Sequence, residues 1–113
     1  MADTDSQPVN EMAEVDSAGF LRDLEAWTPA IAALIARQEN IDLTPAHWEI
    51  IHLVRQYYRR FDSSPSMRPL VKFCAQELGS EKGKSLYLLS LFPGSPAKLA
   101  SKIAGLPKPP NCL

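Results

Sequence analysis

The chain has 113 residues, 45% of them hydrophobic, a length that allows one modest core but no second independent domain. Its 12 basic and 13 acidic side chains nearly cancel, which excludes a protein that is strongly basic or acidic throughout. No stretch approaches the roughly 18 apolar residues that span a bilayer, and the acidic start is unlike a signal peptide. We therefore expect a soluble, cytoplasmic protein.

The charges are unevenly distributed along the chain. Residues 1–42 carry two basic and nine acidic groups, whereas residues 43–113 carry ten and four. A locally basic surface can steer anionic partners or RNA toward a protein. An ordinary solvated helix surface accounts for the same charges equally well.

The N-terminal part predicts a tail followed by a short hairpin. Residues 1–14 are polar and acidic and predict a weakly ordered tail, with a single domain following over residues 15–105. Between Val15 and Trp27, a turn signal at Gly19 precedes a partial alternation of apolar residues. This pattern predicts a short β-hairpin.

Most of the remaining chain predicts helices. A hydroxyl residue followed by proline marks a helix start, because the hydroxyl caps the first turn and proline fits the first helical position. Such pairs occur at residues 28–29, 44–45, 64–65 and 95–96. The predicted helices span residues 29–38, 45–61, 65–78, 80–91 and 96–104. Their apolar spacing predicts a mainly α fold, a small orthogonal bundle of about five helices. On the second helix the predicted core residues are Trp48, Ile51, Val54, Tyr58 and Phe61.

The last eight residues, 106–113, contain three prolines and place Cys112 next to the end of the sequence. Prolines hold a chain extended at about 3.1 Å per residue, so a mobile arm could reach roughly 25 Å from Gly105. A thiol in this place is suited to presentation to a partner, and the alternative is an incidental terminal residue. Because the Leu113 carboxylate disfavours a nearby thiolate, we expect the partner to activate Cys112.

The other cysteine and the two histidines predict structural roles. Cys74 falls in the apolar helical series of its helix, which predicts a small core residue. Its surroundings differ so much from those of Cys112 that we expect two reduced thiols and no disulfide. His47 and His52 have no partners at metal-ligand spacing, so we expect surface or capping histidines and no zinc site.

Basic side chains four residues apart share helix faces. The pairs are Arg55 with Arg59, Arg68 with Lys72, and Lys98 with Lys102. Together with Lys108 they are candidate contacts for a partner protein or RNA. Two consecutive short helices that carry such residues also fit a helix-turn-helix-like nucleic-acid-binding regulator. A solvated face is the alternative, because Asn and Gln are sparse on the third helix.

Several segments together resemble the signature of the DsrC/TusE family of small sulfur-carrier proteins. They are residues 19–21, 43–48, 64–72, Tyr87 with 91–93, 96–98, 102–109, and Cys112. The resemblance implies a helical bundle with a small N-terminal hairpin and a mobile C-terminal arm. It also implies that the penultimate cysteine carries sulfur as a persulfide, without a metal or organic cofactor. Cys112 matches that cysteine.

One position departs from the branch of this family that is associated with dissimilatory sulfite reductase. That branch has a second cysteine eleven residues upstream of the penultimate one, where this chain has Ser101. The resemblance therefore favours the TusE branch and implies a sulfurtransferase of carrier type. Cys112 would accept sulfur from a TusBCD-type donor complex and relay it to an MnmA-type thiouridylase for 2-thiolation of tRNA wobble uridine. The alternatives are a DsrC-like partner of sulfite reductase or sulfur oxidation, and the nucleic-acid-binding regulator.

Overall fold

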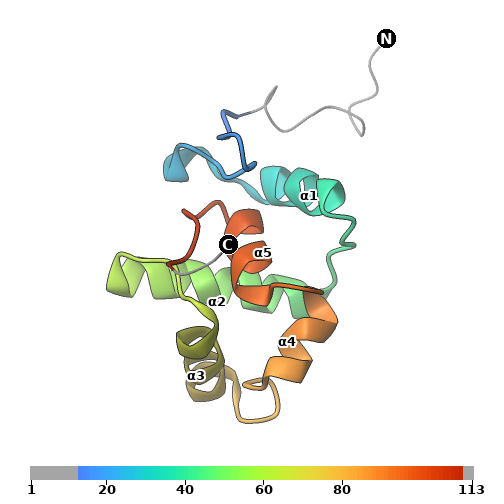
Figure 1. Ribbon diagram of the computed structural model, residues 1–113, viewed down its shortest axis with the longest axis vertical. Coiled ribbons are helices and arrows are strands. Elements are labelled where there is room, and N and C mark those ends of the chain that lie inside the picture. The colour runs from blue at the N-terminus through green and yellow to red at the C-terminus, as the bar shows by residue number, and fades with distance from the viewer. Residues whose placement is uncertain (1–12, 111–113) are drawn as a thin grey trace.

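The computed structural model describes residues 13–110, which consist almost wholly of helices and turns (Figure 1). In chain order the elements are the 3₁₀ helix η3 (Leu24–Ala26) and the α-helices α1 (Pro29–Gln38), α2 (Pro45–Phe61), α3 (Met67–Leu78), α4 (Ser85–Leu91) and α5 (Pro96–Ile103). These elements confirm the predicted mainly α fold with five helices. Within residues 13–110, none of the helices has the length and apolarity that crossing a membrane requires.

The helices α1 and α2 have the bounds that the sequence predicted, and a threonine caps the start of each one. The Thr28 hydroxyl accepts a hydrogen bond from the Ile31 N–H at 3.2 Å. At the start of α2, the Thr44 hydroxyl accepts from the His47 N–H, and His47 Nδ1 accepts from the Thr44 N–H at 3.1 Å. This reciprocal capping box confirms His47 as a capping histidine. A cap of this kind stabilises a helix by about 1 kcal/mol.

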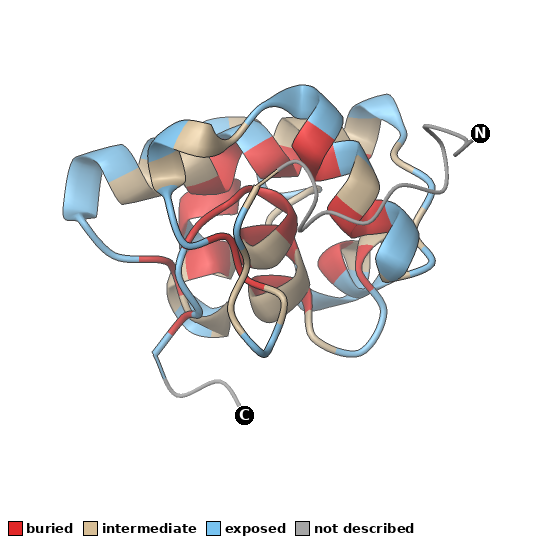
Figure 2. Ribbon diagram, turned by 90° about the horizontal axis from the view of Figure 1, so that it is seen from above, coloured by how far each residue is buried: buried red, intermediate tan, exposed pale blue. Residues whose placement is uncertain are grey.

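The helix α5 forms the centre of the fold. It contacts α1, α2, α3 and α4, and Figure 1 shows α5 in front of α2 with α1 above it. The buried residues gather on the inward faces of the helices (Figure 2). The core includes Ile35, Ile50, Ile51, Val54, Leu70, Cys74, Leu88, Phe92 and Ile103. Burying one such large apolar side chain contributes about 1.5–3 kcal/mol, which stabilises helices too short to form alone.

One aromatic residue differs from the predicted core. Phe61, expected inside, is 51% exposed at the end of α2. The last fully buried residue of α2 is Val54; Tyr57 and Tyr58 still pack against the core, and Phe61 lies beyond it. Phe73 of α3 is buried instead, with its ring centroid 5.3 Å from that of Tyr57 in an edge-to-face arrangement.

The predicted N-terminal hairpin is reduced to a turn. Among the described residues the only pairing of strand type is one antiparallel bridge between Val15 and Leu21. The Asp16 carboxylate accepts from the Phe20 N–H at 2.9 Å and closes the turn. Two residues after the bridge, the Asp23 side chain accepts from a backbone N–H and starts η3. Because this cap turns the chain into a 3₁₀ helix, strand pairing does not extend.

Two helices begin later than predicted. Ser64-Pro65 does not open α3, which begins at Met67. The Ser64 hydroxyl instead donates to the carbonyl of Pro107 at 2.6 Å. The helix α4 was expected from Ser80 or Glu81 but spans Ser85–Leu91. A turn precedes it in which Gly83 approaches α3 so closely that a Cβ atom would lie 2.3 Å from the Cβ of Ala75.

Candidate functional site

The expected nucleophile, Cys112, lies outside the described residues, which end at Pro110. The structure does describe the chain that leads to it, residues 104–110, which we call the root. Figure 1 shows the root running from the end of α5 toward the C-terminal half of α2. The attachment of the root to the body fixes the point from which the chain continues toward Cys112.

Trp27 and Arg55 hold the point at which the chain leaves α5. The Trp27 Nε1–H donates to the Ile103 carbonyl at 2.9 Å, and Arg55 Nη1 donates to the Ala104 carbonyl at 2.6 Å. The guanidinium carbon of Arg55 lies 4.0 Å from the centroid of the Trp27 ring, a cation–π stack. Together the two side chains satisfy carbonyls that the end of a helix leaves without intrahelical partners.

Gly105 makes the turn after α5 possible. Its φ of +74° lies in the left-handed region, and its N–H donates to the Lys102 carbonyl at 3.1 Å. A Cβ atom here would lie 2.4 Å from Cδ1 of Trp27. Glycine therefore meets two requirements at once, the backbone conformation and the close approach of an indole ring.

The root is packed against the body, although the sequence predicted a mobile arm from Leu106 onward. Leu106 is 2% exposed, and its N–H donates to the Ser101 carbonyl at 2.9 Å. The Pro107 carbonyl accepts from the Ser64 hydroxyl, and Pro109 is buried as well. Prolines lack N–H donors but retain apolar rings and carbonyls, which the body binds here. The chain is thus held to the body as far as Pro109, within the segment that was predicted to be a mobile arm.

A cavity of about 590 Å³ opens beside the root. Its lining residues are Arg22, Asp23, Leu24, Glu25, Arg55, Tyr58, Arg59 and Leu106. The predicted pair Arg55 and Arg59 does share one surface, where three arginines oppose two carboxylates. Burial and the charge of Arg59 lower the pKa of the Arg55 guanidinium, and Glu25 opposes this effect. Arg55 binds Trp27 and the Ala104 carbonyl, so it anchors the root, and its contact with a partner or RNA stays a prediction.

Cys74 is fully buried, a free thiol in the core, as predicted. Its Sγ donates to the Lys82 carbonyl at 3.0 Å. Burial raises the pKa of this thiol, the charge of Glu49 raises it further, and Lys82 opposes both. A buried, protonated thiol is a poor nucleophile, so Cys74 is not suited to sulfur chemistry.

Ser101 on α5 is also fully buried. Its backbone carbonyl accepts from Leu106 at the start of the root. Its Oγ has no hydrogen-bond partner among the residues that the structure describes. A buried hydroxyl in this state costs about 1–3 kcal/mol.

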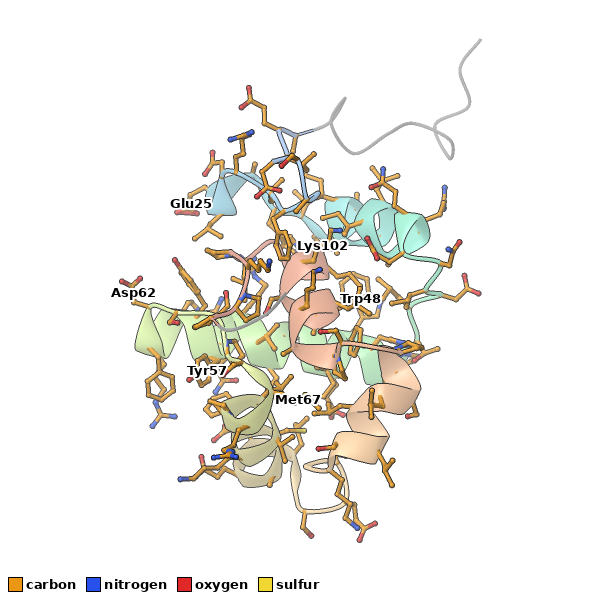
Figure 3. All side chains as sticks on the ribbon, in the orientation of Figure 1. Glu25, Trp48, Tyr57, Asp62, Met67 and Lys102 are labelled. Atoms are coloured by element: carbon orange, nitrogen blue, oxygen red, sulfur yellow. The ribbon has the colours of Figure 1, made fainter. Side chains whose placement is uncertain are left out.

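The remaining basic candidates lie on three parts of the chain, namely α3, α5 and the root. Arg68 and Lys72 on α3 line a second cavity, together with Ser85 of α4. Lys102 on α5, labelled in Figure 3, forms an ion pair with Glu39, with 2.8 Å between Nζ and the carboxylate oxygen. Lys98 is partly buried, and Lys108 is exposed.

Both histidines take part in local packing. His47 Nε2 lies 2.7 Å from the Leu91 carbonyl, and the His52 ring stacks on Trp48 with 6.0 Å between centroids. Among residues 13–110, no three His, Cys, Asp or Glu side chains gather in a way that could hold a metal ion.

Sequence reasoning missed the attachment of the root. Ser64 was taken as a helix cap and Arg55 as a partner contact, whereas both bind the root. A glycine directly after a helix is a signal for a close approach, and Gly105 provides it. Nothing local in the sequence identifies Trp27 as the neighbour that approaches.

Comparisons with known proteins place this chain in a family. The family model described as "DsrC like protein" matches residues 8–113. Sulfurtransferase TusE of Photorhabdus laumondii subsp. laumondii is 53% identical over 100 residues, which cover 88% of this chain and 90% of that protein. Sulfurtransferase TusE of Escherichia coli (strain K12) is 49% identical over 100 residues, which cover 88% and 92%.

Solved structures share the fold. The NMR structure of Allochromatium vinosum DsrC matches with a TM-score of 0.80 at 47% identity, covering 88% of each chain. The crystal structure of the oxidized gamma-subunit of the dissimilatory sulfite reductase (DsrC) from Archaeoglobus fulgidus matches with a TM-score of 0.76 at 39% identity, covering 89% of this chain and 92% of that one. Sequence and structure agree, and this chain belongs to the DsrC-like family.

Proposed function

We propose that this protein is a cytoplasmic sulfur carrier of the TusE type. Cys112 accepts persulfide sulfur from a TusBCD-type donor complex and relays it to an MnmA-type thiouridylase, for 2-thiolation of tRNA wobble uridine. The observation that carries the proposal is identity of about half, over most of the chain, to proteins named sulfurtransferase TusE. The serine at position 101 adds support, because a hydroxyl cannot form the disulfide that a second cysteine would form there.

The chemistry consists of two sulfur exchanges. The Cys112 thiolate attacks the outer sulfur of a donor persulfide, the donor S–S bond breaks, and the donor thiolate leaves. An acceptor thiolate then attacks the outer sulfur of the Cys112 persulfide, and the Cys112 thiolate leaves. Each step forms one S–S bond and breaks another, so no external oxidant, metal or organic cofactor is consumed.

The described residues support a single-thiol carrier. Cys74 is withdrawn from reaction by burial and by its raised pKa, and Ser101 lies buried next to the root. No second sulfur among residues 13–110 is therefore available to release the cargo from Cys112. The carrier has to hand its sulfur to another protein.

Sulfur uptake tests the proposal directly. The protein is incubated with the donor complex and its intact mass is measured without reductant. We expect the wild type to gain one sulfur atom, Cys112→Ser to gain none, and Cys74→Ser to gain as much as the wild type. A loss of stability in Cys74→Ser would be no contradiction, because a hydroxyl in the core carries its own cost. The opposite pattern of uptake would refute the proposal.

The structural similarity to DsrC favours a second candidate, a partner of sulfite reductase or of sulfur oxidation. Complementation separates the two. In a strain that lacks its own TusE, the gene for this chain should restore 2-thiouridine in tRNA, measured by nucleoside mass spectrometry. Restoration by the wild type and not by Cys112→Ser supports the first candidate; no restoration favours the second.

A further inference from the structure

We propose that a groove between α3 and α4 is the surface on which the sulfur donor docks. Its occupant is an acidic protein surface that presents an aliphatic side chain. This inference rests on the proposed function, since it names the place where the carrier meets one of its partners. It concerns residues that have no part in holding the root.

The groove is a basic-rimmed apolar hollow of about 540 Å³. Its lining residues are Met67, Arg68, Val71, Lys72 and Ser85. Met67 and Val71 lie four residues apart and are partly buried, whereas Arg68 and Lys72 are equally spaced and exposed. Spacing of four residues puts each pair on one face of α3. None of the described residues that line the groove is acidic, so it complements a partner with carboxylates.

The helix α4, which contributes Ser85 to the groove, also carries exposed apolar side chains. Leu86, next to Ser85, is 81% exposed, and Leu89 is 37% exposed. Leu89 lies four residues from Ser85 and three from Leu86, on the same side of the helix. Exposed aliphatic side chains that adjoin an apolar hollow are typical of a protein-binding surface.

The groove lies close in sequence and in space to the attachment of the root. Ser64, whose hydroxyl binds the Pro107 carbonyl, precedes the groove residue Met67 by three positions. Figure 3 shows Met67 on the side of α3 that faces α4. A partner bound in the groove would therefore contact the carrier near the segment that leads to Cys112.

The composition of the groove favours a protein over a nucleic acid. Surfaces that bind RNA or DNA are polar and strongly cationic, and they gain nothing from an exposed leucine such as Leu86. Interface cores between proteins combine aliphatic side chains with arginine. The acceptor of the sulfur works on tRNA and needs a cationic surface for its phosphates, which a basic groove would repel. The donor has no such requirement, so charge complementarity assigns the groove to the donor.

Two variants test the groove while leaving Cys112 and the root unchanged. One is the double charge reversal Arg68→Glu with Lys72→Glu, and the other is Leu86→Ser. We expect either variant to raise the Kd for the purified donor complex by at least roughly tenfold, and the charge reversal to slow association most. Arg37→Glu on α1, outside the groove, is the control for the single charge reversal Arg68→Glu and should bind the donor like the wild type. Circular dichroism melts confirm that each variant is folded.

A second donor separates this inference from the proposed function. Glutathione persulfide should load Cys112 equally in the wild type and in both groove variants, because it needs no docking surface. Donor binding that is unchanged in the groove variants would overturn the inference. It would also be overturned if they weakened binding of tRNA alone, measured by fluorescence anisotropy, and left donor binding intact. If the wild type were loaded by neither donor, the proposed function would fail, and the binding measurement would still decide the role of the groove.

Discussion

Replacement of Ser101 by alanine tests the most unusual polar group in the described structure. The Ser101 side chain is fully buried on α5, and its Oγ lacks a hydrogen-bond partner among residues 13–110. Ser101→Ala removes this one oxygen and leaves the backbone, including the carbonyl that binds Leu106, unchanged. We expect the variant to be more stable than the wild type.

The size of the effect follows from three contributions. Relief of an unsatisfied buried hydroxyl is worth about 1–3 kcal/mol. Alanine is also a better helix former than serine, by up to about 0.5 kcal/mol. Against these gains, the void left by one oxygen atom costs about 0.5 kcal/mol or less. The last two contributions cancel, so the free energy of unfolding should rise by about 1–3 kcal/mol, which corresponds to roughly 5–15 °C in Tm for a domain of this size.

Urea unfolding followed by the fluorescence of Trp27 and Trp48 measures this change. Ser90→Ala on α4 is the matched control, because it makes the same chemical change at an exposed helical position. The control should stay within about 0.5 kcal/mol of the wild type. If Ser101→Ala instead lost more than about 0.5 kcal/mol while the control stayed neutral, the hydroxyl would have a partner in the native protein and the reasoning would be refuted.

Three further predictions concern the root and the core thiol. Gly105→Ala should lower the free energy of unfolding by about 2–4 kcal/mol, because it adds left-handed strain to a clash with Trp27. The control is Gly94→Ala, which has a φ of +93° but open space around it and should show the strain alone. Equal losses in the two variants would contradict the clash. Trp27→Phe keeps a ring but removes the N–H that donates to the Ile103 carbonyl. We expect the free energy of unfolding to fall by roughly 1–2 kcal/mol and amide hydrogen exchange at Leu106 to be faster than in the wild type. Unchanged exchange at Leu106 would argue against the anchor. The folded-state pKa of Cys74 is raised above the ordinary value of 9.0, so the contribution of this thiol to stability is complete below pH 9.0 and is lost as the pH rises through the folded-state pKa. Above pH 9.0 the free energy of unfolding should therefore fall less steeply in Cys74→Ala than in the wild type. Parallel curves for the two proteins would contradict this.

The start of a helix could be predicted where its cap depends on neighbours in sequence. Thr28 and Thr44 bond to N–H groups three residues later, and both helices begin at the predicted proline. Ser64 has the same local pattern, but its hydroxyl binds Pro107, a residue far along the chain. The two cases differ in tertiary contact, which a local pattern does not contain. Ser95 has the pattern too and makes no side-chain cap hydrogen bond, although α5 begins at Pro96 as predicted.

The roles of the two cysteines could be predicted from the sequence, whereas the attachment of the root to the body could not. The core position of Cys74 followed from helical spacing, and the interest in Cys112 followed from composition alone. The anchoring of the root by Trp27 and Arg55 depends on how α5 docks on α2 and on the N-terminal turn. Docking of this kind is decided by packing between segments distant in sequence, so residues that looked like free cations became internal contacts.

The packing of the root limits where sulfur can be exchanged. Cys112 is the third residue after buried Pro109, and a fully extended chain of that length spans at most roughly 11 Å. In a relay through Cys112, donor and acceptor must then bring their own sulfur atoms into the same small volume beside the body. The two partners cannot occupy it together, so each has to dissociate before the other binds. Such a carrier would have to serve its partners in alternation.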